Sequence, residues 1–165
     1  LRDHPHIHQV ARWGTVESPV ATAVADQTSA ALRAHPNIRL IFAPWDEFAR
    51  GAKLAADEAG LGEKLRIYSA DISTSDIQAM RDPGSAWRAT AATNPAVVGA
   101  VSVRAMAMLL THEDPGHEVI VHPVLITRDI LLQQDIRTMH DLSEKIPAFA
   151  HSAAAIAPWM PPEAR

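Results

Sequence analysis

Polar and aromatic side chains follow three short apolar runs of this chain, and their types suit a ligand that carries several hydroxyl groups. Trp45 and Asp46 follow the first run, Asp71 ends the second, and Thr93 and Asn94 follow the third. An ionised carboxylate accepts hydrogen bonds on both oxygens, so one aspartate can hold two adjacent hydroxyls. A tryptophan face suits the apolar C–H face of a sugar, or a cation. We expect these side chains to contact a ligand.

Each candidate also has a structural role that its position allows. Asp46 opens a predicted helix, where a carboxylate offsets unpaired N–H groups and the helix dipole. Asn94 precedes a proline that suits a first helical position, so Asn94 or Thr93 could cap that helix. Asp71 lies further from its helix, which Ser73 or Ser75 can cap, so ligand contact is the favoured role there. Two further tryptophans, which could equally pack in a core, complete the candidate set: Trp13 and Trp87.

The elements that position these residues alternate between strands and helices. The nearly continuous apolar runs at residues 38–43, 65–70 and 87–92 are typical of parallel strands buried on both faces. Weak alternation predicts a first strand at residues 7–13, and a last strand at residues 119–126 is interrupted by Pro123, which favours an edge or crossover. This order predicts an α/β fold with a mainly parallel, Rossmann-like sheet and helices on both faces. Ligands bind outside the carboxyl ends of such strands.

Helices are predicted between the strands, and their ends carry recognisable signals. The helix after Asp46 has an apolar stripe at helical spacing and ends at Gly60, which suits a left-handed C-cap. Ser73, Asn94 and Thr138 are predicted to cap the helices that follow them. The stripe consists of Phe48, Ala52, Ala55, Ala56 and Ala59.

Composition excludes several classes of protein. The 165 residues carry a net charge of −4, which gives no electrostatic reason to expect nucleic acid as a partner. The chain has no cysteine, so disulfides and thiolate catalysis are excluded. Neither the glycine-rich dinucleotide signature nor the P-loop occurs. His4, His6 and His8 would share one face of a strand and suit a metal, but we favour an exposed terminus and expect no metal or cofactor.

Beyond these features, five stretches resemble, in the same order, the second lobe of periplasmic sugar-binding proteins of the ribose-binding-protein-like class of ABC importers. The stretches are AHPNI (34–38), IFAPWDEFARGA (41–52), IYSADIS (67–73), GSAWRATAATNP (84–95) and PVLITRD (123–129). The resemblance implies a type I periplasmic-binding fold in which two lobes close on a sugar or polyol. It also implies delivery of the ligand to an ABC permease in the membrane and a periplasmic location, with the signal sequence outside this chain.

The resemblance assigns ligand contacts to Trp45, Asp71 and Thr93. Many relatives carry asparagine at the first of these positions and a longer amide at the third, so the resemblance implies a ligand with a more apolar contact than the best-known sugars. The N-terminal lobe is missing from the chain, which implies weak ligand affinity for this lobe alone. The surface that the other lobe would cover could then support self-association.

The resemblance and the composition together divide the chain into three parts. Residues 1–131 are expected to form the sugar-binding lobe, and residues 132–150 a helical segment that returns through the hinge and has lost its packing partner. The Pro- and Ala-rich residues 151–165 are expected to be a disordered tail. An alternative function is the effector-binding lobe of a lactose-repressor-type regulator. A small α/β enzyme lacks support, because no nucleophile and base occur at a recognisable spacing.

Overall fold

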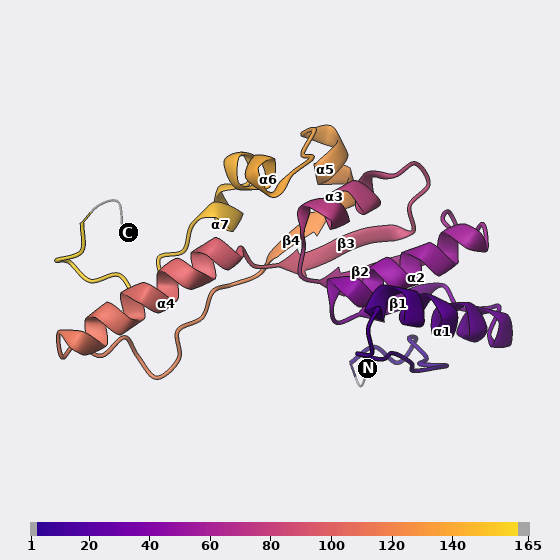
Figure 1. Cartoon of the computed structure of the whole chain (residues 1–165), viewed down its shortest axis with the longest axis horizontal. Helices are drawn as coiled ribbons and strands as arrows, with labels where there is room; N and C mark the ends of the chain where they lie inside the picture. The colour runs from indigo at the N-terminus through magenta and orange to yellow at the C-terminus, as the bar shows by residue number, and fades with distance from the viewer. Residues whose placement is uncertain (1–2, 162–165) are drawn as a thin grey trace.

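The computed structural model describes residues 3–161, in which a sheet and its helices form the larger part and α4 projects away from it (Figure 1). The four strands are β1 (Leu40–Ala43), β2 (Arg66–Ala70), β3 (Trp87–Ala92) and β4 (Val124–Thr127). The helices are α1 (Val20–Ala34), α2 (Asp46–Glu58), α3 (Thr74–Arg81), α4 (Pro95–Leu110), α5 (Arg128–Gln133), α6 (Met139–Lys145) and α7 (Pro147–Ala150).

The sheet has the order β1-β2-β3-β4, with β1, β2 and β3 parallel and β4 antiparallel to β3. The predicted α/β class with a mainly parallel sheet is confirmed. The direction of β4 follows from the path of the chain. The chain leaves the carboxyl end of β3 through α4 and returns to that same end of the sheet, so Val124 becomes the register partner of Ala92. The last strand therefore runs opposite to its neighbour and begins at Val124 rather than near residue 119.

The expected first strand at residues 7–13 is not present in the structure. These residues carry no assigned helix or strand, and residues 7–10 are exposed. A strand is stable only when a neighbour completes its hydrogen-bond ladder. The four strands of the described sheet pair only with one another, so the weak alternation at residues 7–13 finds no partner.

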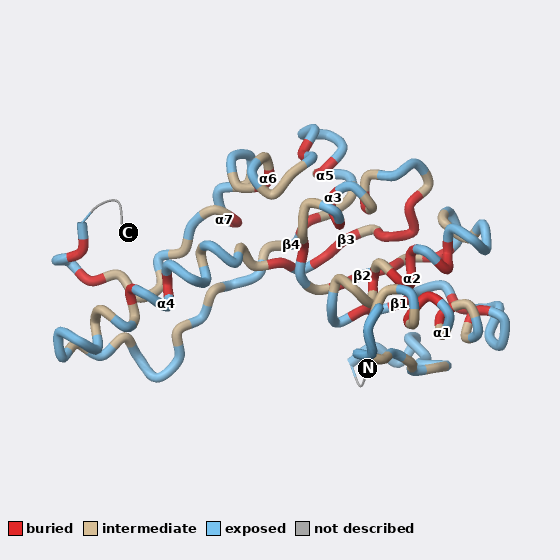
Figure 2. Tube along the Cα trace, viewed as in Figure 1, coloured by how far each residue is buried: buried red, intermediate tan, exposed pale blue. Residues whose placement is uncertain are grey.

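Helices pack on one face of the sheet. α2 contacts β1 and β2, α3 contacts β3, and α5 contacts β3 and β4. Figure 2 shows the buried chain concentrated where these elements meet. On the other face the large apolar side chains are exposed, and within residues 3–161 the expected second helical layer does not cover them. They are Leu40, Phe42, Tyr68 and Leu125.

α1 and α2 approach each other at a glycine. A Cβ atom on Gly51 would lie 2.5 Å from the carbonyl oxygen of Ala21 and 2.9 Å from the Cβ of Val24. The small residues of the predicted stripe are buried beside it, with Ala52 and Ala56 at 1% and 0% exposure. The stripe therefore allows two helix backbones to pack unusually close together on the sheet.

The helix ends follow the local signals of the sequence. The side chains of Ser73, Asn94 and Thr138 accept hydrogen bonds from backbone N–H groups in the first turns of α3, α4 and α6. Gly60 adopts a φ of +63° just after α2, as expected for a left-handed cap. Because each signal acts within one turn of helix, the sequence predicts these ends well.

The segment after β4 belongs to the main core. Leu131, Ile136, Leu142 and Phe149 are each at most 2% exposed and join the cluster that contains Trp87. The expectation that residues 132–150 have lost their packing partner is therefore wrong. α3 is one partner, because Arg81 donates to the carbonyl oxygen of Ile136 at 3.0 Å and the Thr74 hydroxyl accepts from the N–H of Met139 at 3.2 Å.

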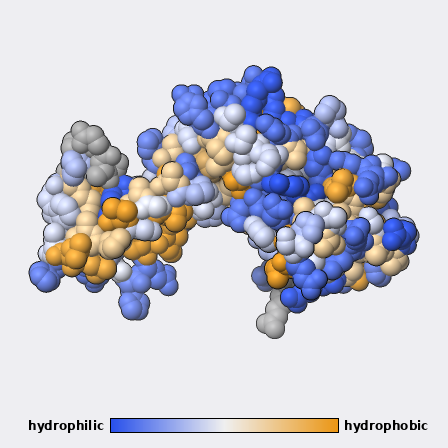
Figure 3. All heavy atoms as spheres, in the orientation of Figure 1, coloured by the Kyte–Doolittle hydropathy of each residue, from blue (hydrophilic) through white to orange (hydrophobic). Residues whose placement is uncertain are grey.

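Most of α4 is not buried within the described chain. Only Val101 and Arg104 of its sixteen residues are buried, and apolar atoms are gathered on its surface in Figure 3. The end of the chain contacts it, because the Arg104 guanidinium donates to the carbonyl oxygens of Ser152 and Ala154, each at 2.9 Å. Residues 151–161 carry no assigned helix or strand, but Ala157 and Met160 are buried, so this segment is more closely packed than a disordered tail would be. Residues 162–165 lie outside the described part.

Candidate ligand-binding site

The carboxyl ends of β1, β2 and β3 lie side by side, which brings distant parts of the sequence to one edge. Ala43 is the register partner of Ser69, and Ala70 is the partner of Ala91. The residues that follow these strand ends are therefore neighbours across the sheet. They are Trp45, Asp46, Asp71, Thr93 and Asn94.

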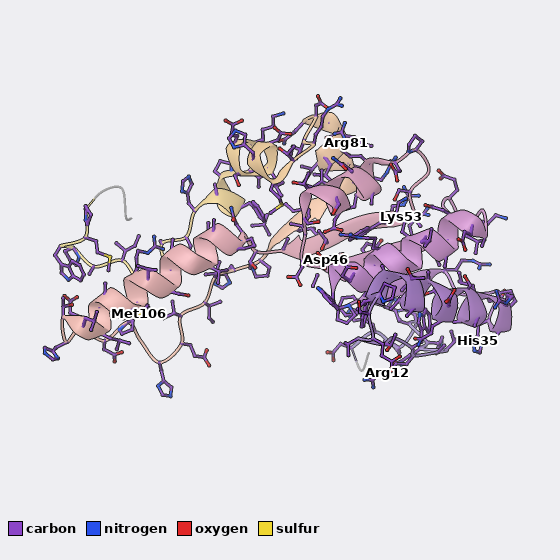
Figure 4. All side chains as sticks on the ribbon, viewed as in Figure 1. Arg12, His35, Asp46, Lys53, Arg81 and Met106 are labelled. Carbon is purple, nitrogen blue, oxygen red and sulfur yellow. The ribbon has the colours of Figure 1, made fainter. Side chains whose placement is uncertain are left out.

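Asp46 is the first residue of α2 and lies at the end of the sheet from which α4 extends (Figure 4). Its Oδ1 accepts a hydrogen bond of 2.8 Å from the N–H of Glu47 and so pairs with one N–H group of the first turn, although the N-cap residue of α2 is Trp45. Partial burial, the carboxylate of Asp76 and that of Asp71 raise the pKa of Asp46 to about 6. The carboxylates of Asp76 and Asp71 are thus close enough to influence that of Asp46.

Asp71 follows β2 in a left-handed conformation, with a φ of +67°. Its backbone is held from the neighbouring strand, because its N–H donates to the oxygen of Ala91 at 3.0 Å and its own oxygen accepts from the Thr90 hydroxyl at 2.6 Å. Asp71 is exposed, whereas the next residue, Ile72, is buried. The turn therefore leaves a carboxylate accessible at the sheet edge.

Trp45 supplies an accessible aromatic ring beside the carboxylates. It is the N-cap residue of α2 and remains 38% exposed. Its ring centroid lies 5.7 Å from that of Phe48, at an interplanar angle of 55°. This tilted pair fixes the indole while leaving part of it free for the apolar face of a ligand.

Asn94 is already engaged on both ends of its amide. Its Oδ1 accepts from the N–H of Ala96 at 3.0 Å, and its Nδ2 donates to the Ser143 hydroxyl at 3.2 Å. The cap therefore accounts for the oxygen, and the amide nitrogen ties the start of α4 to α6. Thr93 is half-buried beside it.

The other two tryptophans make contacts within the fold. Trp87 lies at the amino end of β3, is 0% exposed, and donates from its indole nitrogen to the buried hydroxyl of Ser69 at 2.8 Å. Trp13 is half-buried, packs against the core and donates to the Thr28 hydroxyl of α1 at 2.8 Å. Both side chains match the core role that the sequence left open.

Sequence reasoning did not identify Arg50 and Asp76, which support this edge from behind. Asp76 is wholly buried, and its Oδ1 lies 2.8 Å from the guanidinium of Arg50. Arg50 also donates to the hydroxyl of Ser75 at 3.0 Å, and Ser73 donates to the other oxygen of Asp76 at 2.5 Å. The spacing of four residues between Asp46 and Arg50 is a signal that both lie on one helix face. No local signal could have paired Arg50 with α3.

Other kinds of site find no support in the described residues. Residues 3–161 contain no group of three or more histidine, aspartate or glutamate side chains placed to hold a metal ion. His4 and His6 are exposed, with ring centroids 5.9 Å apart in an edge-on arrangement. In the same range, none of the helices is both long and apolar enough to span a membrane.

The sequence matches one protein-family model. The model of the periplasmic binding protein domain matches residues 1–114. The chain belongs to this family. The resemblance seen in the strand ends is therefore confirmed, and the family is one of ligand-binding proteins rather than of enzymes.

Three solved structures of transporter proteins agree with this assignment. A 5-methylthioribose transporter solute-binding protein from Thermotoga lettingae, in complex with 5-methylthioribose, is 35% identical with a TM-score of 0.88 over 96% of this chain and 50% of that chain. A sugar ABC transporter protein from Yersinia enterocolitica is 30% identical with a TM-score of 0.85 over 96% and 48%. An ABC transporter solute-binding protein from Agrobacterium vitis with bound allitol is 25% identical with a TM-score of 0.69 over 77% and 44%.

The chain thus spans about half the length of the solved relatives it matches. The comparison with curated proteins gave no match.

Proposed function

We propose that this chain is one lobe of the solute-binding component of an ABC importer, which binds a sugar or polyol in a cleft between two lobes. The observation that carries the proposal is the joint presence of Trp45, Asp46 and Asp71 at the carboxyl edge of a sheet whose fold matches sugar-binding relatives. The other lobe would supply the second wall of the site.

The side chains at this edge suit a ligand with two kinds of surface. The exposed carboxylate of Asp71 accepts hydrogen bonds from hydroxyls, and the exposed part of Trp45 offers an apolar contact. One relative binds 5-methylthioribose, which combines hydroxyls with an apolar methylthio group, and another binds allitol. We therefore propose a pentose-like sugar or polyol, with a preference for ligands that carry an apolar substituent.

The exposed helix α4 supports a second lobe as a partner. Val103, Met106 and Leu110 are 62%, 57% and 79% exposed, and their spacing places them on one face of the helix. A face of this kind is stabilised by burial against another part of the protein. In the proposed importer this partner is the other lobe, the protein is periplasmic, and it delivers its ligand to the ABC permease.

The test measures the affinity of the two-lobed protein for 5-methylthioribose and allitol by calorimetry. Loss of a carboxylate that holds ligand hydroxyls costs about 10- to 100-fold in affinity, so Asp71→Ala should weaken binding by that factor. Asp26→Ala, at an exposed position on α1, is the control and should leave affinity unchanged. Unchanged affinity in Asp71→Ala would remove Asp71 from the site.

The lobe alone presents one wall of the proposed cleft. One wall must offset the whole entropy cost of association, so we propose that the 165-residue chain binds these ligands only weakly. Its uncovered surfaces then favour self-association. A tight sugar complex of the monomeric chain would overturn the two-lobed proposal.

A further inference from the structure

We propose that Thr90 is a positioning residue for the ligand site, because it holds Asp71 in the backbone conformation that presents its carboxylate at the sheet edge. The proposal rests on the proposed function, since it gives Asp71 the role of holding ligand hydroxyls. Thr90 itself is 1% exposed and so acts through Asp71 rather than by touching a ligand.

Two consecutive residues of β3 hold both peptide groups of Asp71. The hydroxyl of Thr90 donates to the carbonyl oxygen of Asp71 at 2.6 Å, and the N–H of Asp71 donates to the oxygen of Ala91 at 3.0 Å. Since β2 ends at Ala70, the Thr90 hydroxyl makes a contact beyond the regular ladder of the sheet. A valine of the same shape would leave the oxygen of Asp71 without this donor.

Asp71 needs such support because its φ of +67° is disfavoured for a residue with a Cβ atom. Glycine would adopt this conformation at no steric cost, and a turn that served only to connect β2 with α3 would suit glycine best. Aspartate tolerates the conformation better than most residues and adds a carboxylate. The buried hydrogen bond from Thr90 to the Asp71 oxygen is called the clamp below. A strained backbone, such a buried clamp and an exposed charge together are typical of a functional position.

The turn also separates two side chains that must point in different directions. Ile72 is 7% exposed and belongs to the core, whereas Asp71 is exposed. Ser73 then caps α3. Release of the Asp71 oxygen would therefore let the backbone relax between two fixed points, the end of β2 and the cap of α3, and would move the carboxylate first.

The first test examines residue 71 without any ligand, by NMR of the 165-residue chain. Thr90→Val should shift the Asp71 Cα and Cβ resonances and speed exchange of the Asp71 amide by about 10-fold, the effect of one lost hydrogen bond. Thr90→Ser, which keeps the hydroxyl, should retain the wild-type values. Thr28→Val is the matched control. Thr28 lies on α1, and its wholly buried hydroxyl accepts a hydrogen bond from Trp13. Wild-type shifts and exchange in Thr90→Val would overturn the proposal.

If Thr90→Val folds poorly, its effect on stability can be compared between the wild type and the Asp71→Gly variant. Glycine takes the left-handed conformation unaided, so Thr90→Val should cost the Asp71→Gly protein less stability than it costs the wild type. An equal loss of stability in both backgrounds would mean that Thr90 does not support residue 71, and it would refute the clamp.

The second test measures the affinity of the two-lobed protein for 5-methylthioribose. Thr90→Val should weaken binding by about 10-fold and Thr90→Ser should restore it. In an Asp71→Ala background, Thr90→Val should have no further effect, because its target is gone. Binding that depends on Asp71 but not on Thr90 refutes only the clamp. A wild type that binds no sugar refutes the proposed function, whereas the NMR result on the clamp still stands.

Discussion

Arg50 and Asp76 join α2 to α3 directly behind the residues at the sheet edge, with 2.8 Å between the guanidinium nitrogen and the carboxylate oxygen. The carboxylate is wholly buried, whereas the arginine side chain is 36% exposed. A buried charge is tolerated only when it is paired, so the arginine offsets the cost of burying the Asp76 side chain. The Asp76 carboxylate in turn raises the pKa of Asp46.

Removal of Arg50 should therefore destabilise the protein more than removal of a surface arginine. Arg50→Met leaves Asp76 buried without its cation, and we expect a loss of about 2–3 kcal/mol in the free energy of unfolding. Arg137→Met is the control, because the pair of Arg137 with Asp135 is exposed on both sides and should contribute little to stability. Urea unfolding measures both. Equal losses in the free energy of unfolding would show that the buried pair contributes no more to stability than the exposed one.

The pH dependence of stability should carry the signature of Asp46. Its folded-state pKa of about 6 lies above the ordinary value of 3.8, chiefly because of burial and then because of Asp76. The folded protein therefore holds a proton that the unfolded chain releases, and this contribution to stability falls as the pH rises from about 4 to about 6. Asp46→Asn should remove that fall. Carboxyl NMR should give a midpoint near 6, and thermal unfolding across this range measures the slope.

Asp141 provides a comparison of opposite sign. A hydrogen bond from the backbone N–H of Arg137, followed by bonds from Thr138, lowers the pKa of Asp141. Its contribution is therefore present above the ordinary pKa and is lost as the pH falls through the lower folded-state value. Asp141→Asn should change stability at neutral pH but leave the fall between pH 4 and 6 intact. A wild-type slope in Asp46→Asn would assign the pH dependence to another group.

Two helical glycines should respond to alanine in opposite directions. Gly51→Ala places a Cβ against the backbone oxygen of Ala21, which cannot move without separating α1 from α2. We expect a loss of about 1–3 kcal/mol from this overpacking. Gly99 in α4 has nothing within 4 Å of the same position, so Gly99→Ala should stabilise the chain by about 0.5–1 kcal/mol through helix propensity. Thermal unfolding distinguishes the two, and a stabilising Gly51→Ala would contradict the close approach of the helices.

The apolar face of α4 should cause self-association of the isolated chain. Leu110→Lys places a charge on a residue that is 79% exposed, so it should weaken self-association by about 10-fold while leaving stability almost unchanged. Ser102→Lys adds the same charge at another exposed position on α4 and should have a smaller effect. Sedimentation velocity measures the association. A monomeric wild-type chain at all concentrations would exclude this surface as a self-association site.

The features that the sequence predicts well are those set by a few neighbouring residues. Four helix caps are set by contacts within one turn, and the sequence identifies all of them: Ser73, Asn94 and Thr138 at N-termini and Gly60 at a C-terminus. The parallel strands were also recognisable, because burial on both faces leaves short apolar runs. Their shared edge follows from the general geometry of parallel sheets.

The remaining features depend on contacts between distant residues. The direction of β4 is set by where the chain returns after α4, and the core position of Trp87 is set by its place at the amino end of β3. The pairing of Arg50 with Asp76 spans twenty-six residues and two helices. The burial of Leu131 and Ile136 depends on the packing of α5 against α3 and the sheet. None of these contacts leaves a periodic or local pattern that sequence reasoning could read.

The different environments of the tryptophans make the chain its own optical reporter. Trp87 is sealed in the core, whereas Trp45 and Trp159 are 38% and 49% exposed. A soluble quencher should therefore reduce the emission of the two exposed indoles and leave that of Trp87 until the protein unfolds. With Trp159 replaced by phenylalanine, Trp45 becomes the most exposed of the three remaining tryptophans, and protection from quenching would report occupancy of the sheet edge without any attached dye.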